Sequence, residues 1–196
     1  MTIRPNETNT SNGILYARAM ESTERYVSAI RDDQWGDPTP CSDWNVRDIV
    51  NHITNENLWA VELFAGKRME DVGNRLDGDL LGSDPIGAYH RSVLAAADAA
   101  QAPGSMERTC HLSFGDYPGS ELAKQLFLDT LIHGWDIAKA TGQDTRLDPS
   151  LVEACYPVAQ ALEAQFGQYG VFGSKLTVPK DADTQTKILA LLGRKA

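Results

Sequence analysis

The 196-residue sequence has no concentration of positive charge. It contains 18 Lys and Arg against 27 Asp and Glu, and its formal net charge is −9 at pH 7. Proteins that bind nucleic acid neutralise phosphates with clusters of Lys and Arg, and no such cluster is visible here. The same deficit disfavours adhesion to anionic membrane surfaces. We therefore expect neither nucleic acid nor a membrane among the partners.

Long apolar runs and a secretory leader are also missing. No run approaches the roughly 20 residues that span a bilayer, and the polar segment 1–13 lacks the apolar centre of a signal peptide. The 3 cysteines are odd in number and widely spaced, which disfavours a disulfide framework and favours the reducing cytoplasm. No CxxC pair occurs, so a zinc site built only of thiolates is excluded.

Signatures of common enzyme classes are absent too. The sequence has no GxGxxG or GxxxxGK[ST] loop for nucleotides and no GxSxG elbow for a serine nucleophile. It also lacks the alternation of strands and helices that builds a parallel sheet. Cys41 is a candidate reactive thiol, but no basic residue adjoins it in the sequence to activate it.

Helical periodicity is what the sequence does contain. Apolar residues recur at helical spacing over residues 14–31, 46–64, 85–103, 120–141, 149–166 and 182–192. We predict an all-α protein in which the first four helices form a four-helix bundle and one or two extra helices follow. Residues 1–12 are expected to be a disordered polar tail, and residues 13–196 a single helical domain with 145–196 as a C-terminal appendage.

The connections carry their own signals. Asn45 and Asp48 form a capping-box pattern at the start of the second helix, and Gly142 is a natural stop for the fourth. Residues 66–83 are predicted to be a long connection, and residues 106–119 a short extended piece followed by a turn. The Gly-rich segment 167–175 is either a lid or a plain linker.

The most informative stretch is FLDTLIHGWDIAKATGQ, residues 127–143. It places Asp129 and His133 four residues apart, hence one turn apart on one helix face, inside an apolar pattern. His52 stands in a similar apolar context on the second helix. Two imidazoles and one carboxylate are ligands that zinc, iron and nickel accept, and three protein ligands leave an open position for catalysis.

Simpler interpretations exist for each of these groups. A lone histidine in a core is more often hydrogen-bonded than metal-bound, and Asp129 and His133 also suit a buried hydrogen bond. His90 is expected to be exposed. His111 offers a fourth ligand, a pocket wall or an ordinary surface position.

Three stretches resemble one family: TPCSDWNVRDIVNHI at 39–53, DTLIHGWDIAKATGQ at 129–143 and VPKDADTQTKILALLGR at 178–194. They are similar to the DinB/YfiT-like superfamily, in its actinobacterial branch related to mycothiol-dependent maleylpyruvate isomerases. The resemblance implies a four-helix bundle that binds a divalent metal through His52, Asp129 and His133. Many relatives have His or Glu in place of Asp129, so this shorter arm is expected to shift the ion or weaken its binding.

The resemblance also implies a chemistry. The superfamily is best known for transferring or adding low-molecular-weight thiols, so we expect a metal-dependent enzyme that activates a mycothiol-like thiol for S-transfer or isomerisation of a small electrophile. Zinc is the first expectation for the metal, with nickel and iron as alternatives. The chain is too short for the second domain of the isomerases, so their specific reaction is not implied. Glu56, Trp59, His111 and Phe114 are the expected pocket residues.

Three alternatives stay open. The first is a metal-dependent hydrolase or lyase, because the same ligands also suit a metal-bound hydroxide. The second is a non-catalytic protein that binds a metal or small ligand, and the third is a purely structural pair of Asp129 and His133. The sequence leaves the oligomeric state open, a homodimer included.

Overall fold

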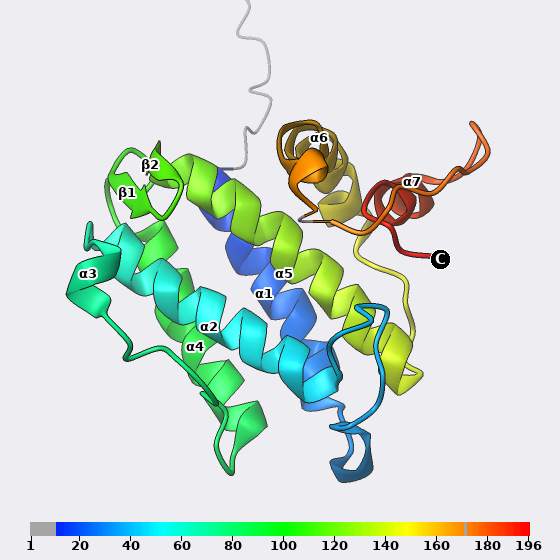
Figure 1. The fold of residues 1–196 in the computed structure, drawn as a ribbon, viewed down its shortest axis with the longest axis horizontal. Coiled ribbons are helices and arrows are strands. Elements are labelled where there is room, and N and C mark those ends of the chain that lie inside the picture. Colours follow the sequence, from blue (N-terminus) through cyan, green and yellow to red (C-terminus); the bar gives the residue numbers. More distant parts are fainter. Residues whose placement is uncertain (1–10, 171) are drawn as a thin grey trace, which may run out of the picture.

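Four long helices form the body of the protein in a computed structural model that describes residues 11–170 and 172–196. They are α1 (Asn12–Ser28), α2 (Val46–Phe64), α4 (Pro85–Gln101) and α5 (Gly119–Thr141). Helix α1 packs against α4 and α5, and α2 packs against the same two helices (Figure 1). The predicted all-α four-helix bundle is confirmed.

Local signals explain where the central helices begin and end. The Asn45 side chain accepts a hydrogen bond from the backbone N–H of Asp48, and the Asp48 carboxylate accepts one from the backbone N–H of Asn45. These bonds satisfy donors that the first turn of a helix leaves free. Helix α5 ends at Gly142, whose positive φ of 70° is readily adopted only by glycine. Both predicted signals are confirmed.

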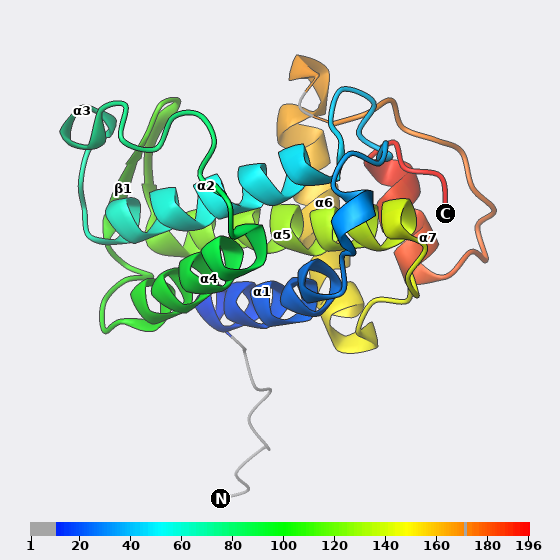
Figure 2. The same cartoon turned by 90° about the horizontal axis from the view of Figure 1, so that it is seen from below.

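Two further helices follow the bundle. Helix α6 (Pro149–Phe166) crosses the bundle beside α5, and α7 (Thr184–Leu191) packs on α6 (Figure 2). Leu151 of α6 and Ile188 of α7 belong to the same hydrophobic cluster as the bundle. Burying that apolar surface ties the C-terminal segment to α5, and the last residues of the chain therefore return to the bundle.

The structure differs from the sequence-based expectation in three connections. The segment 106–119 forms a two-stranded antiparallel hairpin, β1 (Thr109–Leu112) and β2 (Gly115–Pro118), where one extended piece and a turn were expected. Its second strand was missed because Gly115 and Pro118 normally signal turns, yet both lie at strand ends, where they are tolerated. The connection 66–83 contains the short α3 (Met69–Val72), and a 3-10 turn, η1 (Asp32–Gln34), follows α1.

The N-terminal boundary is also earlier than expected. Helix α1 starts at Asn12 because the Ser11 hydroxyl accepts a hydrogen bond from the backbone N–H of Ile14. The rest of the predicted tail, residues 1–10, lies outside the described residues. Another 3-10 turn, η2 (Gly167–Tyr169), opens the Gly-rich segment after α6. Within the described chain, no helix is long and apolar enough to cross a membrane.

Candidate metal centre and its pocket

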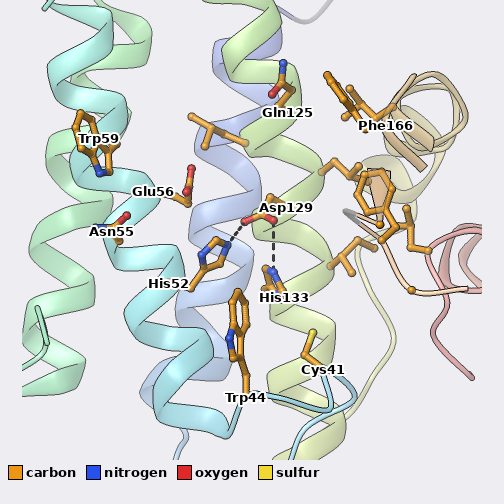
Figure 3. Close-up of a pocket in the computed structure, with 18 of the residues that line it drawn as sticks. Cys41, Trp44, His52, Asn55, Glu56, Trp59, Gln125, Asp129, His133 and Phe166 are labelled. Carbon is orange, nitrogen blue, oxygen red and sulfur yellow. Dashed lines mark hydrogen bonds and ion pairs between the residues drawn. The ribbon is translucent and has the colours of Figure 1, made fainter. Parts of the chain in front are cut away.

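The three predicted ligands converge between α2 and α5. His52 Nε2 lies 3.1 Å from Asp129 Oδ2, and His133 Nε2 lies 3.4 Å from Asp129 Oδ1. One donor atom from each of the three residues lies within 4.8 Å of the others. Figure 3 shows both imidazoles directed at the Asp129 carboxylate, on the side of α5 that faces α2.

This donor set fits a divalent ion. Two atoms that each lie about 2.1 Å from one ion, at an angle of about 90–110°, are separated by about 3.0–3.4 Å. Each imidazole faces its own oxygen of the Asp129 carboxylate, and both distances fall in that range. Two imidazoles and one carboxylate are also a common ligand set of catalytic zinc. The residues therefore fit the metal that the sequence suggests.

The charges of this cluster stabilise one another. Burial by itself would raise the pKa of Asp129, but the rings of His133 and His52 outweigh it and hold this pKa well below its usual value. Burial would likewise lower the pKa of His133, yet Asp129 and Asp136 hold it well above its usual value. A positive charge beside the Asp129 carboxylate is thus favoured, and protonation of His133 is one way to provide that charge.

Close helix packing positions His133. At the neighbouring Gly134, an added Cβ would lie 2.4 Å from Thr23 Oγ1, so glycine lets α1 approach α5 at this level. The Thr23 hydroxyl donates to the backbone carbonyl of Thr130, 3.0 Å away. This contact holds the two helices together directly behind the ligand pair.

Trp44 covers the two imidazoles. Its ring centroid lies 4.7 Å from that of His52 and 5.7 Å from that of His133. The loop before α2 carries Trp44 and is folded back by Thr39, whose hydroxyl donates to the Trp44 carbonyl at 2.7 Å. Packing of this kind restricts the rotamers of both rings and keeps Nε2 of each directed at Asp129.

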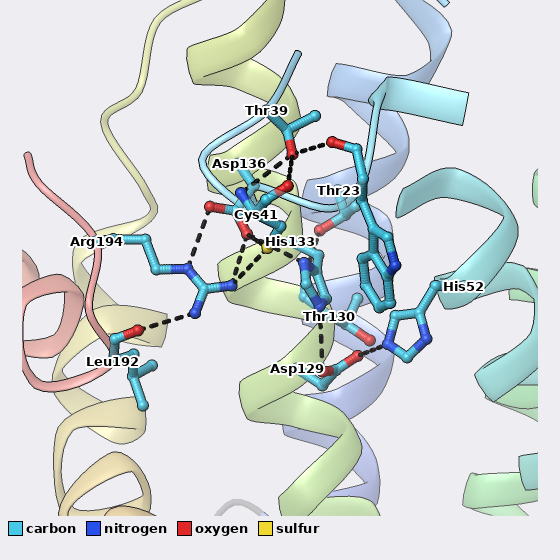
Figure 4. Close-up of polar contacts among 11 residues, drawn as sticks. Thr23, Thr39, Cys41, His52, Asp129, Thr130, His133, Asp136, Leu192 and Arg194 are labelled. Atoms are coloured by element: carbon cyan, nitrogen blue, oxygen red, sulfur yellow. Dashed lines mark hydrogen bonds and ion pairs between the residues drawn. The ribbon is translucent and has the colours of Figure 1, made fainter. Parts of the chain in front are cut away.

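A second polar cluster lies on the other side of His133 (Figure 4). His133 Nδ1 is 3.1 Å from Oδ2 of Asp136, a fully buried carboxylate. Arg194, two residues from the chain end, donates from its terminal nitrogen to the same oxygen at 2.9 Å and to Cys41 Sγ at 3.0 Å. Burial would raise the pKa of Asp136, but His133 and Arg194 hold it below its usual value. The Asp136 carboxylate therefore fixes the ring orientation that presents Nε2 to Asp129.

The second cluster also contains a metal-type group, formed by Cys41, His133 and Asp136. Its position is already taken by a cation, because the Arg194 guanidinium contacts both Cys41 and Asp136. The group on the Asp129 side is therefore the candidate metal site. The sequence suggested that Cys41 has no basic neighbour, and the fold supplies one from 153 residues away.

A pocket of about 820 Å³ opens beside the ligands. Three of the four residues proposed for a pocket, Glu56, Trp59 and Phe114, line it. Burial and the nearby Asp129 raise the pKa of the Glu56 carboxyl. His111, by contrast, lies on β1 with Nδ1 2.8 Å from Asp116, and it is absent from the described lining of the pocket. Pairing of β1 with β2 directs it to the hairpin and away from the ligands.

Sequence reasoning missed three contributors: Trp44 as a cover of the rings, Asp136 and Arg194. A signal existed for Asp136, which follows His133 by three residues and so shares its helix face. Arg194 ends the family-like stretch 178–194, but only the packing of α6 and α7 carries it back to α5.

Comparisons with known proteins agree with this architecture. Residues 16–138 match the family described as the mycothiol maleylpyruvate isomerase N-terminal domain. An uncharacterized protein of Mycobacterium tuberculosis, present in strains CDC 1551 / Oshkosh and H37Rv, is 33% identical over 181 residues, covering 91% of this chain and 95% of the relative. The crystal structure of the mycothiol-dependent maleylpyruvate isomerase shares the fold, with a TM-score of 0.62 at 12% identity, covering 86% of this chain and 75% of that one. The chain therefore belongs to the mycothiol maleylpyruvate isomerase N-terminal domain family.

Proposed function

We propose that this protein is a divalent-metal-dependent enzyme that activates a low-molecular-weight thiol, such as mycothiol, for S-transfer to a small electrophile or for its isomerisation. The observation that supports it best is the convergence of His52, Asp129 and His133 beside an open pocket. Three protein ligands leave a position for an exogenous group, which is typical of catalytic metal sites. The family name supports a thiol as that group.

A bound divalent ion would supply Lewis acidity that favours the thiolate, the nucleophilic form of a thiol, near neutral pH. The protein residues supply orientation and proton handling. Asp136 accepts from Nδ1 of His133, and Trp44 packs on both rings, so each Nε2 keeps its direction. Glu56, one turn after His52, offers a carboxylate oxygen that can take the proton released by the thiol.

The metal is tested by elemental analysis of the purified protein beside His52→Ala and His133→Ala. We expect about one zinc per chain in the wild type, with nickel or iron as the alternatives, and near-complete loss in both variants. His90→Ala is the matched control, since His90 is exposed and pairs with Glu24 on the far side of the bundle. Retention of the metal in either ligand variant would refute the assigned triad.

The reaction is tested by incubating the metal-loaded protein with an electrophilic probe, with and without thiol. We expect consumption of the probe only when thiol is present, and loss of that activity in His52→Ala. Turnover without thiol would replace this proposal by a metal-dependent hydrolase or lyase. Tight metal binding without turnover on a panel of electrophiles would indicate a binding protein.

A further inference from the structure

We infer that the pocket beside His52, Asp129 and His133 takes an uncharged or cationic molecule with an apolar body, and that it discriminates against dicarboxylates. This inference deepens the proposed function and rests on it, because it concerns the electrophile that shares the pocket with the thiol. Three features of the pocket support this inference: its arginine is already paired, its lining is acidic, and its walls are aromatic.

The pocket offers no free cation to an anionic ligand. Among the described residues that line it, Arg194 is the one Lys or Arg. Its guanidinium is engaged by Asp136 at 2.9 Å, by Cys41 at 3.0 Å and by the Leu192 carbonyl at 3.0 Å. The Arg194 side chain is only 12% exposed. Recognition of a carboxylate normally uses a guanidinium whose donors are available, and these are not.

The field inside the pocket opposes a further negative charge. Asp43, Glu56 and Asp129 all line it. Glu56 has no ion pair among the described residues, so it faces the pocket without a counter-charge. An incoming dianion would lie beside these three acidic side chains, and like charges at short distance repel. A bound divalent ion would add positive charge beside Asp129, and the Asp129 carboxylate and a thiolate would offset it.

The walls of the pocket suit an apolar body. Trp59 on α2 and Phe166 at the end of α6 face the pocket from opposite sides (Figure 3). Phe166 is joined by Phe114 of the hairpin tip, with ring centroids 6.0 Å apart at 69°. Phe114 is 54% exposed, so part of its ring is available for contact. Aromatic rings of this kind bind alkyl and aryl groups by dispersion and burial of apolar area.

The test compares phenylsuccinate with its dimethyl ester. Both are saturated and therefore inert to thiols, they share one apolar body, and they differ in charge. Binding to the metal-free full chain is followed by calorimetry without thiol, so that no ion coordinates either compound. We expect the diester to bind about tenfold or more tightly than the dianion, because like charges in a pocket are unfavourable. Equal or tighter binding of the dianion, or binding of neither compound, would overturn the inference.

Matched variants locate the effect. Gln125→Lys adds a cation to the pocket wall and should narrow the ratio of diester to dianion affinity to about threefold or less. Gln101→Lys adds the same charge on the exposed end of α4 and should leave that ratio unchanged.

The aromatic wall is tested by a second pair of variants. Phe166→Ala should weaken diester binding about fivefold. Its control is Tyr169→Ala, which removes an exposed aromatic ring outside the pocket lining. Circular dichroism confirms that each variant is folded. An unchanged preference in Gln125→Lys would contradict the field argument.

The two proposals fail separately. Because binding is measured without thiol, a diester preference in a protein that never consumes thiol would refute the proposed reaction and leave the pocket chemistry intact. A second comparison uses maleate and dimethyl maleate as substrates, each rate being divided by its uncatalysed rate with the same thiol. If the enzyme accelerates the reaction of maleate as much as that of the diester, or more, the inference is refuted and the proposed reaction stands.

Discussion

The two sides of the His133 ring carry similar residue types, but one side faces an open pocket and the other is buried and already neutralised. On the Nε2 side, Asp129 and His52 face an open pocket, and the Asp129 side chain is 36% exposed. On the Nδ1 side, Asp136 is fully buried and an arginine from the C-terminal segment fills the space beside it. A carboxylate and an imidazole are therefore insufficient to define a metal site. What distinguishes the two sides is whether the protein already supplies the cation.

The largest expected effect comes from removing the charge on the closed side. Asp136→Asn keeps the shape but leaves Arg194 buried without its counter-charge, so we expect destabilisation by about 3–5 kcal/mol, the usual cost of breaking a buried pair. Urea denaturation of the metal-free protein measures it. Asp136→Asn combined with Arg194→Met should lose less than the sum of the single variants. Strict additivity would show that the two groups are not coupled.

Removing the charge on the open side should separate metal binding from folding. We expect Asp129→Asn to lower metal affinity more than about 100-fold. Such a loss is larger than the loss caused by changing a residue that only hydrogen-bonds to a metal ligand. The free energy of unfolding of the metal-free protein should fall by less than in Asp136→Asn, because water reaches the 36%-exposed Asp129 side chain and screens its ion pairs. Competition with a chromogenic chelator and urea denaturation give the two values. A stability loss as large as that of Asp136→Asn would abolish the distinction between the sides.

A smaller effect is expected at the cover of the rings. Trp44→Leu removes the surface that packs on His52 and His133, so we expect metal affinity to fall about tenfold through looser ring orientation. Trp59→Leu is the matched control, because Trp59 lines the same pocket and has no ring contact with either imidazole in the described chain. Equal losses in the two variants would attribute the effect to general repacking of the pocket.

The smallest effect concerns His111. We expect His111→Ala to retain the full metal content and affinity of the wild type, because its ring pairs with Asp116 on the hairpin. Elemental analysis and the same chelator competition measure both. A fall in either value would mean that the hairpin closes over the site and supplies a further ligand.

Much of the fold could be predicted from local signals. The spacing of apolar residues predicted the four bundle helices and α6, and the Asn45–Asp48 box and Gly142 located two of their ends. These signals are readable because a helix end is decided by residues within one turn of it. The β2 strand was missed because a two-stranded hairpin depends on pairing between its strands. The local sequence, with Gly115 and Pro118 at the strand ends, does not indicate that pairing.

The sequence by itself determined that Asp129 and His133 share one face of one helix, because helix geometry relates residues four apart. It also determined that His52 lies on another apolar helix face. Only the tertiary structure decided that His52 meets that pair, that Trp44 covers it, and that Arg194 neutralises Asp136 across 58 residues. The physical reason is that such contacts depend on which helices pack together, and burial of apolar surface over the whole chain selects that packing. The same packing decides which carboxylate keeps a resident cation and which one faces an open pocket.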